Sequence, residues 1–239
     1  MYFDFNFRKI LVLLLLSLVL ILSWVHNDLT HIWKSVDVSV FYTLNSSLEG
    51  NTYWSMLWAF LSLREADIVA AIVIFLFFYS NGVVFNKEER LKGFIGFVTL
   101  LFVMLIVREL VDLFVEIYKL NRPSPSLVLD SSIRLSELYP TLHPKDASPT
   151  SFPGDHAAVL FTWFGYCIYF AKNKWSLAIL FATIFFALPR LIAGAHWFSD
   201  VAVGGLSIAL ISISLGLYTP LLNKVNSKLT SLLSGYLFK

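Results

Sequence analysis

The sequence has few charged residues and a single cysteine. Lys, Arg, Asp and Glu make up 14% of the 239 residues, whereas hydrophobic residues make up 57% and aromatic residues 16%. These proportions differ from those of soluble globular domains and indicate an integral membrane protein. The formal charge of +2, with no dense basic patch, gives no support for a nucleic-acid partner. Because Cys167 has no second cysteine to pair with, no intramolecular disulfide can form, and we expect it to be a packing or lipid-facing residue.

Six apolar segments are predicted to cross the membrane as helices, although several are shorter than the roughly 20 residues that span a hydrocarbon core. The first resembles the hydrophobic part of a signal peptide, but no small-residue cleavage site follows it. The predicted spans are residues 10–25, 66–85, 91–110, 157–170, 175–188 and 201–218. We therefore expect an all-α fold, in which residues 1–239 form one membrane domain of six transmembrane helices. Segment 37–63 has mixed polarity and contains Trp54 and Trp58, which is typical of an interfacial or re-entrant element.

The distribution of basic residues predicts the orientation of the six spans. An even number of spans places both termini on one side of the membrane, and short cytoplasmic loops are enriched in Lys and Arg. The basic residues on that side are Arg8, Lys9, Lys87, Arg90, Lys92, Lys172, Lys174, Lys224, Lys228 and Lys239. Both termini are therefore expected in the cytoplasm, and loops 119–156 and 189–199 outside it. These two loops contain almost every residue of chemical interest.

The third span is predicted to extend beyond the bilayer. A helix over residues 91–118 would be roughly 42 Å long, which exceeds the hydrocarbon core. Its far end carries Arg108, Asp112, Glu116 and Lys119, whose spacings of four, four and three place them on one face of a helix. This face could be a salt-bridged packing surface, or it could lead into an active site.

The strongest chemical motif runs from Arg190 through His196 to Asp200. If a helix begins near His196, Asp200 lies one turn further on and can accept a hydrogen bond from one ring nitrogen. The other ring nitrogen would then be free to act as a nucleophile. Arg190 offers a fork of donors that suits phosphoryl oxygens. An isolated histidine at a membrane boundary is more often structural, so this motif needs the two that follow.

A second motif, Pro153-Gly154-Asp155-His156, lies directly before the fourth predicted span. Pro and Gly favour a tight turn, and the helix N-terminus after it can attract an anion. His156 could protonate a leaving oxygen as a general acid. The alternative is an ordinary turn in which Asp155 caps the helix.

A third motif, at the end of the third span, places Lys119 and Arg122 about one helical turn apart, with Pro123 next. Two cations in this position can bind phosphate oxygens. They can equally well anchor the helix end at the lipid headgroups.

The three motifs together resemble the signature of the phosphatidic acid phosphatase type 2 superfamily, which reads K-x6-R-P, P-S-G-H and S-R-x5-H-x3-D. The resemblance implies that His196 attacks phosphorus to form a phosphohistidine, that Asp200 orients it, and that His156 protonates the leaving group. It also implies phosphate binding by Arg122 and Arg190, with no metal and no other cofactor. Gly154 and Asp155 occupy the positions of the signature's Ser and Gly, and so are also candidate substrate-binding residues.

Three positions depart from the signature. Val115 stands where it has its lysine, so Lys119 could only be a displaced substitute. Gly154 stands in place of the serine of the second motif, which removes a hydroxyl that would help to hold phosphate. Pro189 replaces the serine before Arg190.

Four further stretches carry a finer resemblance: Ser124-Pro125, residues 134–138, residues 145–156 and residues 189–200. Through them, most of the chain resembles one branch of the superfamily, the lipid A 1-diphosphate synthases of Gram-negative inner membranes. The branch transfers a phosphate from undecaprenyl pyrophosphate to the 1-phosphate of lipid A on the periplasmic face. This resemblance implies these two lipids as partners and implies no obligate protein partner. Arg134, His143 and Lys145 in loop 123–150 are candidate contacts for the acceptor, in particular Arg134 and Lys145 for its phosphate. The F-P-x-D-H form of the second motif also resembles undecaprenyl pyrophosphate phosphatases, in which water is the acceptor.

Two other classes of protein remain as alternatives. A small transporter or membrane scaffold could carry the same apolar segments, but the sequence shows no internal repeat of the kind that transporters often have. A heme or metal protein could use the five histidines, which lack a compact ligand spacing.

Overall fold

The structure, a computed structural model, describes residues 5–171, 175–222, 224, 225 and 227–229. Every named element in these residues is a helix, which confirms the predicted all-α class. The elements are α1 (Phe7–Val25), α2 (Asn27–Asn45), the 3-10 turn η1 (Ser46–Leu48), α3 (Thr52–Leu61), α4 (Ala66–Tyr79), α5 (Arg90–Ile117), α6 (Pro125–Val128), α7 (Leu135–Leu138), α8 (Asp155–Phe170), α9 (Trp175–Ile192), the π-helical turn η2 (Asp200–Gly205) and α10 (Leu206–Leu217).

Four helical segments within the described residues are long and apolar enough to cross a membrane: α1, α5, α9 and the continuous segment Asp200–Leu217. The other two predicted spans are helical but shorter, since α4 has 14 residues and α8 has 16. The structure is therefore consistent with a bundle of membrane helices, but only four of the six predicted spans reach the length of an independent crossing.

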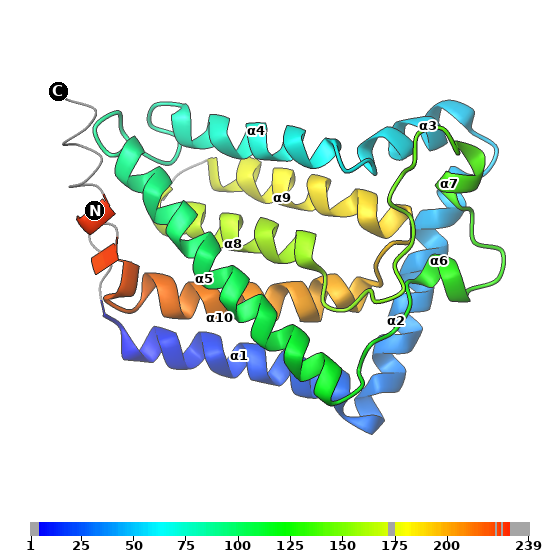
Figure 1. Cartoon of the computed structure of the whole chain (residues 1–239), viewed down its shortest axis with the longest axis horizontal. Coiled ribbons are helices and arrows are strands. Elements are labelled where there is room, and N and C mark those ends of the chain that lie inside the picture. Colours follow the sequence, from blue (N-terminus) through cyan, green and yellow to red (C-terminus); the bar gives the residue numbers. More distant parts are fainter. Residues whose placement is uncertain (1–4, 172–174, 223, 226, 230–239) are drawn as a thin grey trace.

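The exposure of apolar side chains differs between the outer and the central helices. On α1, α4, α5 and α9 many large apolar side chains are exposed, as expected for surfaces that face lipid. By contrast, α10 lies in the centre, in contact with α1, α5 and α8 (Figure 1). Its buried face consists largely of small residues, which allow helices to approach closely in a membrane. At Gly216, for example, a Cβ atom would lie 2.4 Å from the Leu100 side chain.

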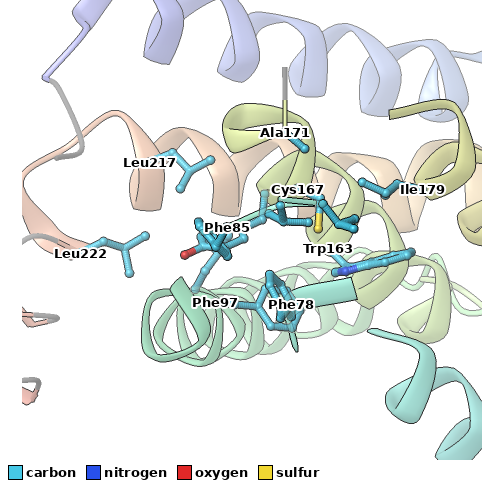
Figure 2. Close-up of a cluster of buried hydrophobic side chains, with 13 residues drawn as sticks. Phe78, Phe85, Phe97, Trp163, Cys167, Ala171, Ile179, Leu217 and Leu222 are labelled. Atoms are coloured by element: carbon cyan, nitrogen blue, oxygen red, sulfur yellow. The ribbon is translucent and has the colours of Figure 1, made fainter. Parts of the chain in front are cut away.

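The largest apolar cluster of the described residues lies toward the end of the bundle that carries the start of α1 and the end of α10. It joins α4, α5, α8 and α9 to the end of α10, and Figure 2 shows aromatic rings from several of these helices side by side. Phe78 contacts the rings of Phe85, Phe94, Phe97 and Tyr166. Cys167 is buried in this cluster, so it is a packing residue rather than a lipid-facing one.

The two ends of the bundle are different in character. The start of α1, the α4–α5 connection and the end of α10 lie together at one end (Figure 1). Of the predicted cytoplasmic cations, Lys172, Lys174 and Lys239 lie outside the described residues. The opposite end carries α2, α3, α6 and α7, and α2 runs across the bundle rather than along it. Segment 37–63, predicted to be interfacial, forms the second half of α2 together with η1 and α3, and neither helix is among the membrane-crossing segments of the described chain.

Replacement of Phe78 by Ala should destabilise the protein by about 3 kcal/mol, because it leaves a cavity among four aromatic rings. Thermal unfolding in detergent measures the effect. The matched control is Phe181→Ala, since Phe181 is 73% exposed on α9 and its removal should change stability by less than about 0.5 kcal/mol. Equal melting temperatures for the two variants would contradict the placement of this core.

Candidate active site

Three segments that are far apart in the sequence meet where the α5–α8 loop crosses the end of α9 (Figure 1). The main-chain N–H of Ser151 donates to the carbonyl oxygen of Arg122 at 2.8 Å. The indole N–H of Trp197 donates to the carbonyl oxygen of Pro123, also at 2.8 Å. The segment around Arg122 therefore holds both other motifs through its main chain.

A cavity of about 450 Å³ lies against these segments. Its lining includes His156, His196, Arg64, Asp67, Lys145 and Arg190. The two histidines of the sequence motifs, His156 and His196, therefore line one cavity. Arg190, which was predicted to bind phosphate, lines the same cavity.

The turn between Arg190 and His196 depends on a glycine. Helix α9 ends at Ile192, and Gly194 follows with a φ of +78°, which favours glycine because a side chain would be strained there. A Cβ atom at Gly194 would also lie 2.7 Å from the ring of Phe41. After the turn, the N–H of His196 donates to the carbonyl oxygen of Arg190 at 3.2 Å. The six-residue spacing therefore allows the chain to turn so that the main chain of His196 lies next to that of Arg190.

The ring of His196 is held by its Nδ1 atom. This atom lies 2.7 Å from the carbonyl oxygen of Ser151 and 3.5 Å from Oδ2 of Asp200. A carbonyl oxygen only accepts, so Nδ1 carries the proton and the lone pair is on Nε2, as a nucleophile requires. The sequence predicts Asp200 as an acceptor for this ring, and the structure adds a closer acceptor in the main chain of the second motif. Asp200 also accepts from the N–H of Trp197 at 2.8 Å, so it fixes the start of the following helix.

The ring of His156 is held by its Nε2 atom, whereas the ring of His196 is held by Nδ1. Its Nε2 atom lies 3.0 Å from the carbonyl oxygen of Phe186 on α9, and its Nδ1 atom lies 3.5 Å from Oδ1 of Asp67 on α4. Nε2 is therefore protonated, and Nδ1 is the atom that can gain or lose a proton. His156 lies outside the predicted membrane span, since it directly precedes residues 157–170. Burial lowers the pKa of His156, the negative charge of Asp67 raises it, and the positive charge of Arg190 lowers it again.

Arg190 is almost fully buried and has defined partners. Its Nη1 atom donates to the carbonyl oxygen of Ser62 at 2.9 Å, and its Nη2 atom donates to both oxygens of Asp67 at 3.0 and 3.1 Å. Because Asp67 also faces His156, a single carboxylate connects the arginine with the candidate general acid. Sequence reasoning missed Asp67, since it stands at the start of a predicted span and belongs to no motif.

Arg122 does not line the cavity, and its side chain contacts the residues that support His196. Its Nε atom donates to Asp200 at 3.1 Å, Nη1 donates to Asp37 at 3.0 Å and Nη2 donates to Ser199 at 2.6 Å. The guanidinium group also lies between the rings of Trp24 and Trp197. All three nitrogens are occupied by protein, so the structure gives no support for the phosphate contact predicted for Arg122.

Lys119 and Gly154 do not line the cavity, although Pro153 and Asp155 on either side of Gly154 do. Lys119 is exposed at the end of α5. The N–H of Gly154 donates to the carbonyl oxygen of Asp200 at 3.0 Å, so it is not free for an anion. A Cβ atom at Gly154 would lie 2.9 Å from the same oxygen, which explains why a serine would not fit there.

Asp155 does line the cavity, but its carboxylate accepts from Arg108 on α5, with both contacts at 3.0 Å. Arg108 also pairs with Asp112 at 2.9 Å. Part of the polar face of α5 is therefore a salt-bridged packing surface, and this surface ends at the cavity. The face was predicted to be either a salt-bridged packing surface or a route into an active site, and the structure shows part of each.

The position of the missing lysine is filled by an apolar residue. Val115 is buried in a cluster with Trp24, Phe152 and Val203. A lysine there would place a charge among apolar side chains, at a cost that such clusters do not repay.

Comparison with known proteins agrees with the motifs. The PAP2 superfamily pattern matches residues 96–223, which is more than half of the chain. This chain belongs to the PAP2 superfamily. Enzymes of the PAP2 superfamily are lipid phosphatases and phosphotransferases that use a histidine nucleophile. The chain is also 30% identical to the lipid A 1-diphosphate synthase of Escherichia coli (strain K12) over 222 residues, which cover 92% of this chain and 91% of that protein. No solved structure matches it.

Replacement of Arg122 by Ala should destabilise the protein by about 3–5 kcal/mol, because Asp37 and Asp200 are buried and would lose their shared partner. Burial already raises the pKa of Asp37 against the opposing effect of Arg122. The measurement is thermal unfolding in detergent, with the exposed cation variant Lys34→Ala as control. A purely phosphate-binding arginine predicts weaker substrate binding with an unchanged melting temperature, and that result would overturn the placement.

Proposed function

We propose that this PAP2 protein is a phosphotransferase that moves a phosphoryl group from undecaprenyl pyrophosphate to the 1-phosphate of lipid A through a phosphohistidine at His196. The observation that carries the proposal is the state of His196: Nδ1 is bound to a carbonyl oxygen, and the ring lies at a cavity beside Arg190. The named activity of the Escherichia coli relative supports the choice of lipids.

The geometry supports the following first half-reaction. Nε2 of His196 attacks the terminal phosphorus of the pyrophosphate, and the bond to the bridging oxygen breaks. The carbonyl of Ser151 and the carboxylate of Asp200 stabilise the positive charge that develops on the ring. Nδ1 of His156 supplies a proton to the departing oxygen, and Arg190 holds the phosphoryl oxygens.

In the second half-reaction, an oxygen of the acceptor attacks the phosphohistidine and releases His196. If the acceptor is water, the same site is a phosphatase. The proposal includes the predicted topology, with six spans, both termini in the cytoplasm of a bacterial inner membrane, and the cavity on the periplasmic side. The start of α1, the α4–α5 connection and the end of α10, where basic residues are predicted to face the cytoplasm, lie at the end of the bundle opposite α2, α3, α6 and α7 (Figure 1), which supports this orientation.

The decisive experiment follows the label from undecaprenyl pyrophosphate radiolabelled in its terminal phosphate, with and without lipid A. Transfer predicts label on lipid A, and hydrolysis predicts free phosphate in both reactions. A His196→Gln variant should carry no label and show no turnover, whereas His156→Gln should slow labelling of the protein by about 100-fold or more. Label transfer by the His196→Gln variant would exclude His196 as the nucleophile.

The role of His156 predicts a specific dependence on pH. A general acid must be protonated, so phosphorylation of the protein should slow as the pH rises through the pKa of His156. The carboxylate of Asp67 raises this pKa, so Asp67→Asn should lower it and move the falling limb of the rate profile to lower pH. Single-turnover phosphorylation rates of both proteins across pH measure the shift. An unchanged falling limb, or a shift to higher pH, would contradict the role of His156.

A further inference from the structure

Two cations outside the sequence motifs line the cavity: Arg64, between α3 and α4, and Lys145, in the α5–α8 loop. The main-chain N–H of Lys145 donates to the carbonyl oxygen of Ser62 at 2.9 Å. The same oxygen accepts from Nη1 of Arg190 at 2.9 Å. The carbonyl group of Ser62 therefore brings Lys145 close to Arg190. Ser62 itself stands two residues before Arg64 in the chain.

These cations are not neutralised by nearby carboxylates. Among the described residues, no carboxylate lies within 4.0 Å of the charged atoms of Arg64 or Lys145. The two carboxylates of the cavity are engaged elsewhere, Asp67 by Arg190 and Asp155 by Arg108. Burial lowers the pKa of Lys145, and the positive charges of Arg64 and Arg190 lower it further. Two cations without a carboxylate partner, next to Arg190, are suited to a multiply charged anion.

We infer that Arg64 and Lys145 bind a second phosphate next to the one that His196 attacks, so that the site selects a diphosphate over a monophosphate. The inference deepens the proposed function and depends on it for the identity of the reaction. The family's lysine position cannot serve here because Val115 is buried in an apolar cluster. Arg134, our other candidate for the acceptor phosphate, pairs with Glu137 at 3.2 Å and does not line the cavity.

The chemistry allows this subsite to serve in both half-reactions. When the bond between phosphorus and the bridging oxygen breaks, its electrons leave with a lipid monophosphate, and Arg64 and Lys145 would hold that group. In the reverse sense, the phosphate oxygen of a second lipid monophosphate forms a bond to phosphorus, and the electrons of the broken N–P bond return to His196. The departing and the incoming groups are chemically alike, so one pair of cations can position both.

A neighbouring cavity supplies space for what the second phosphate carries. Arg64 and Lys145 also line a second cavity of about 450 Å³ on the side of Leu142 and His143. The two cations therefore form a wall shared by both cavities. A phosphate held at this wall is next to His196 on one side and has room for its substituent on the other.

The test measures binding of inorganic pyrophosphate and orthophosphate to the purified full-length protein in detergent, by calorimetry. The wild-type protein should bind pyrophosphate at least about tenfold more tightly than orthophosphate. The variant Arg64→Gln/Lys145→Gln should weaken pyrophosphate binding by about tenfold or more and orthophosphate binding by less than about threefold. The control Lys34→Gln removes an exposed cation of α2 and should change neither affinity.

Equal loss of both affinities, or no loss, would overturn the inference. If the double variant melts at a lower temperature, the single variants Arg64→Gln and Lys145→Gln replace it, and each should lose part of the preference for pyrophosphate. Farnesyl diphosphate and farnesyl phosphate in micelles repeat the comparison for a lipid-linked phosphate, and retention of farnesyl diphosphate affinity by the double variant would also overturn it. A wild-type protein that prefers pyrophosphate but transfers no label would reject the proposed function and leave the subsite intact.

Discussion

The position of His196 depends on the contacts of one buried cation. Arg122 pairs with Asp200, which lies 3.5 Å from Nδ1 of the histidine, and with Asp37 on the crossing helix α2. Its carbonyl oxygen holds Ser151, whose own carbonyl oxygen accepts from the same ring nitrogen. One residue therefore determines both acceptors of Nδ1. Because buried carboxylates are costly without a partner, the network has one favourable arrangement, and that arrangement leaves Nε2 as the unprotonated ring nitrogen.

Part of the site could be predicted from the sequence because it depends on local spacing. Arg190, His196 and Asp200 are close in the chain, so helix and turn geometry bring them together, and Gly194 marks the turn. The placement of His156 at a helix start followed from Pro153 and Gly154 in the same way. Local spacing carried this information. The all-helical fold likewise followed from long apolar runs, whereas the lengths of α4 and α8 depend on packing around them.

The remaining residues could not be predicted, because their roles depend on contacts between distant segments. Arg122 matched a phosphate-binding motif, but α2 supplies Asp37 to its guanidinium group, and no local pattern announces that pairing. Asp67, Arg64 and Lys145 line the cavity in a region where the carbonyl oxygen of Ser62 joins α9 to the α5–α8 loop. Val115 shows the reverse case, since a motif position became part of an apolar cluster.

The same long-range contacts bear on whether water or a lipid phosphate takes the phosphoryl group. The proposed phosphohistidine at His196 would react with whichever nucleophile is oriented toward phosphorus, and positioning can contribute as much to such a step as the chemistry of the attacking atom. Arg190 and Asp67 line the cavity and contact each other. Arg64 and Lys145 line the same cavity, and their positive charges attract an anion more strongly than neutral water. If the proposed function holds, the charges of Arg64 and Lys145 would favour a phosphate acceptor over neutral water, so that residues outside the family motifs would decide between transfer and hydrolysis.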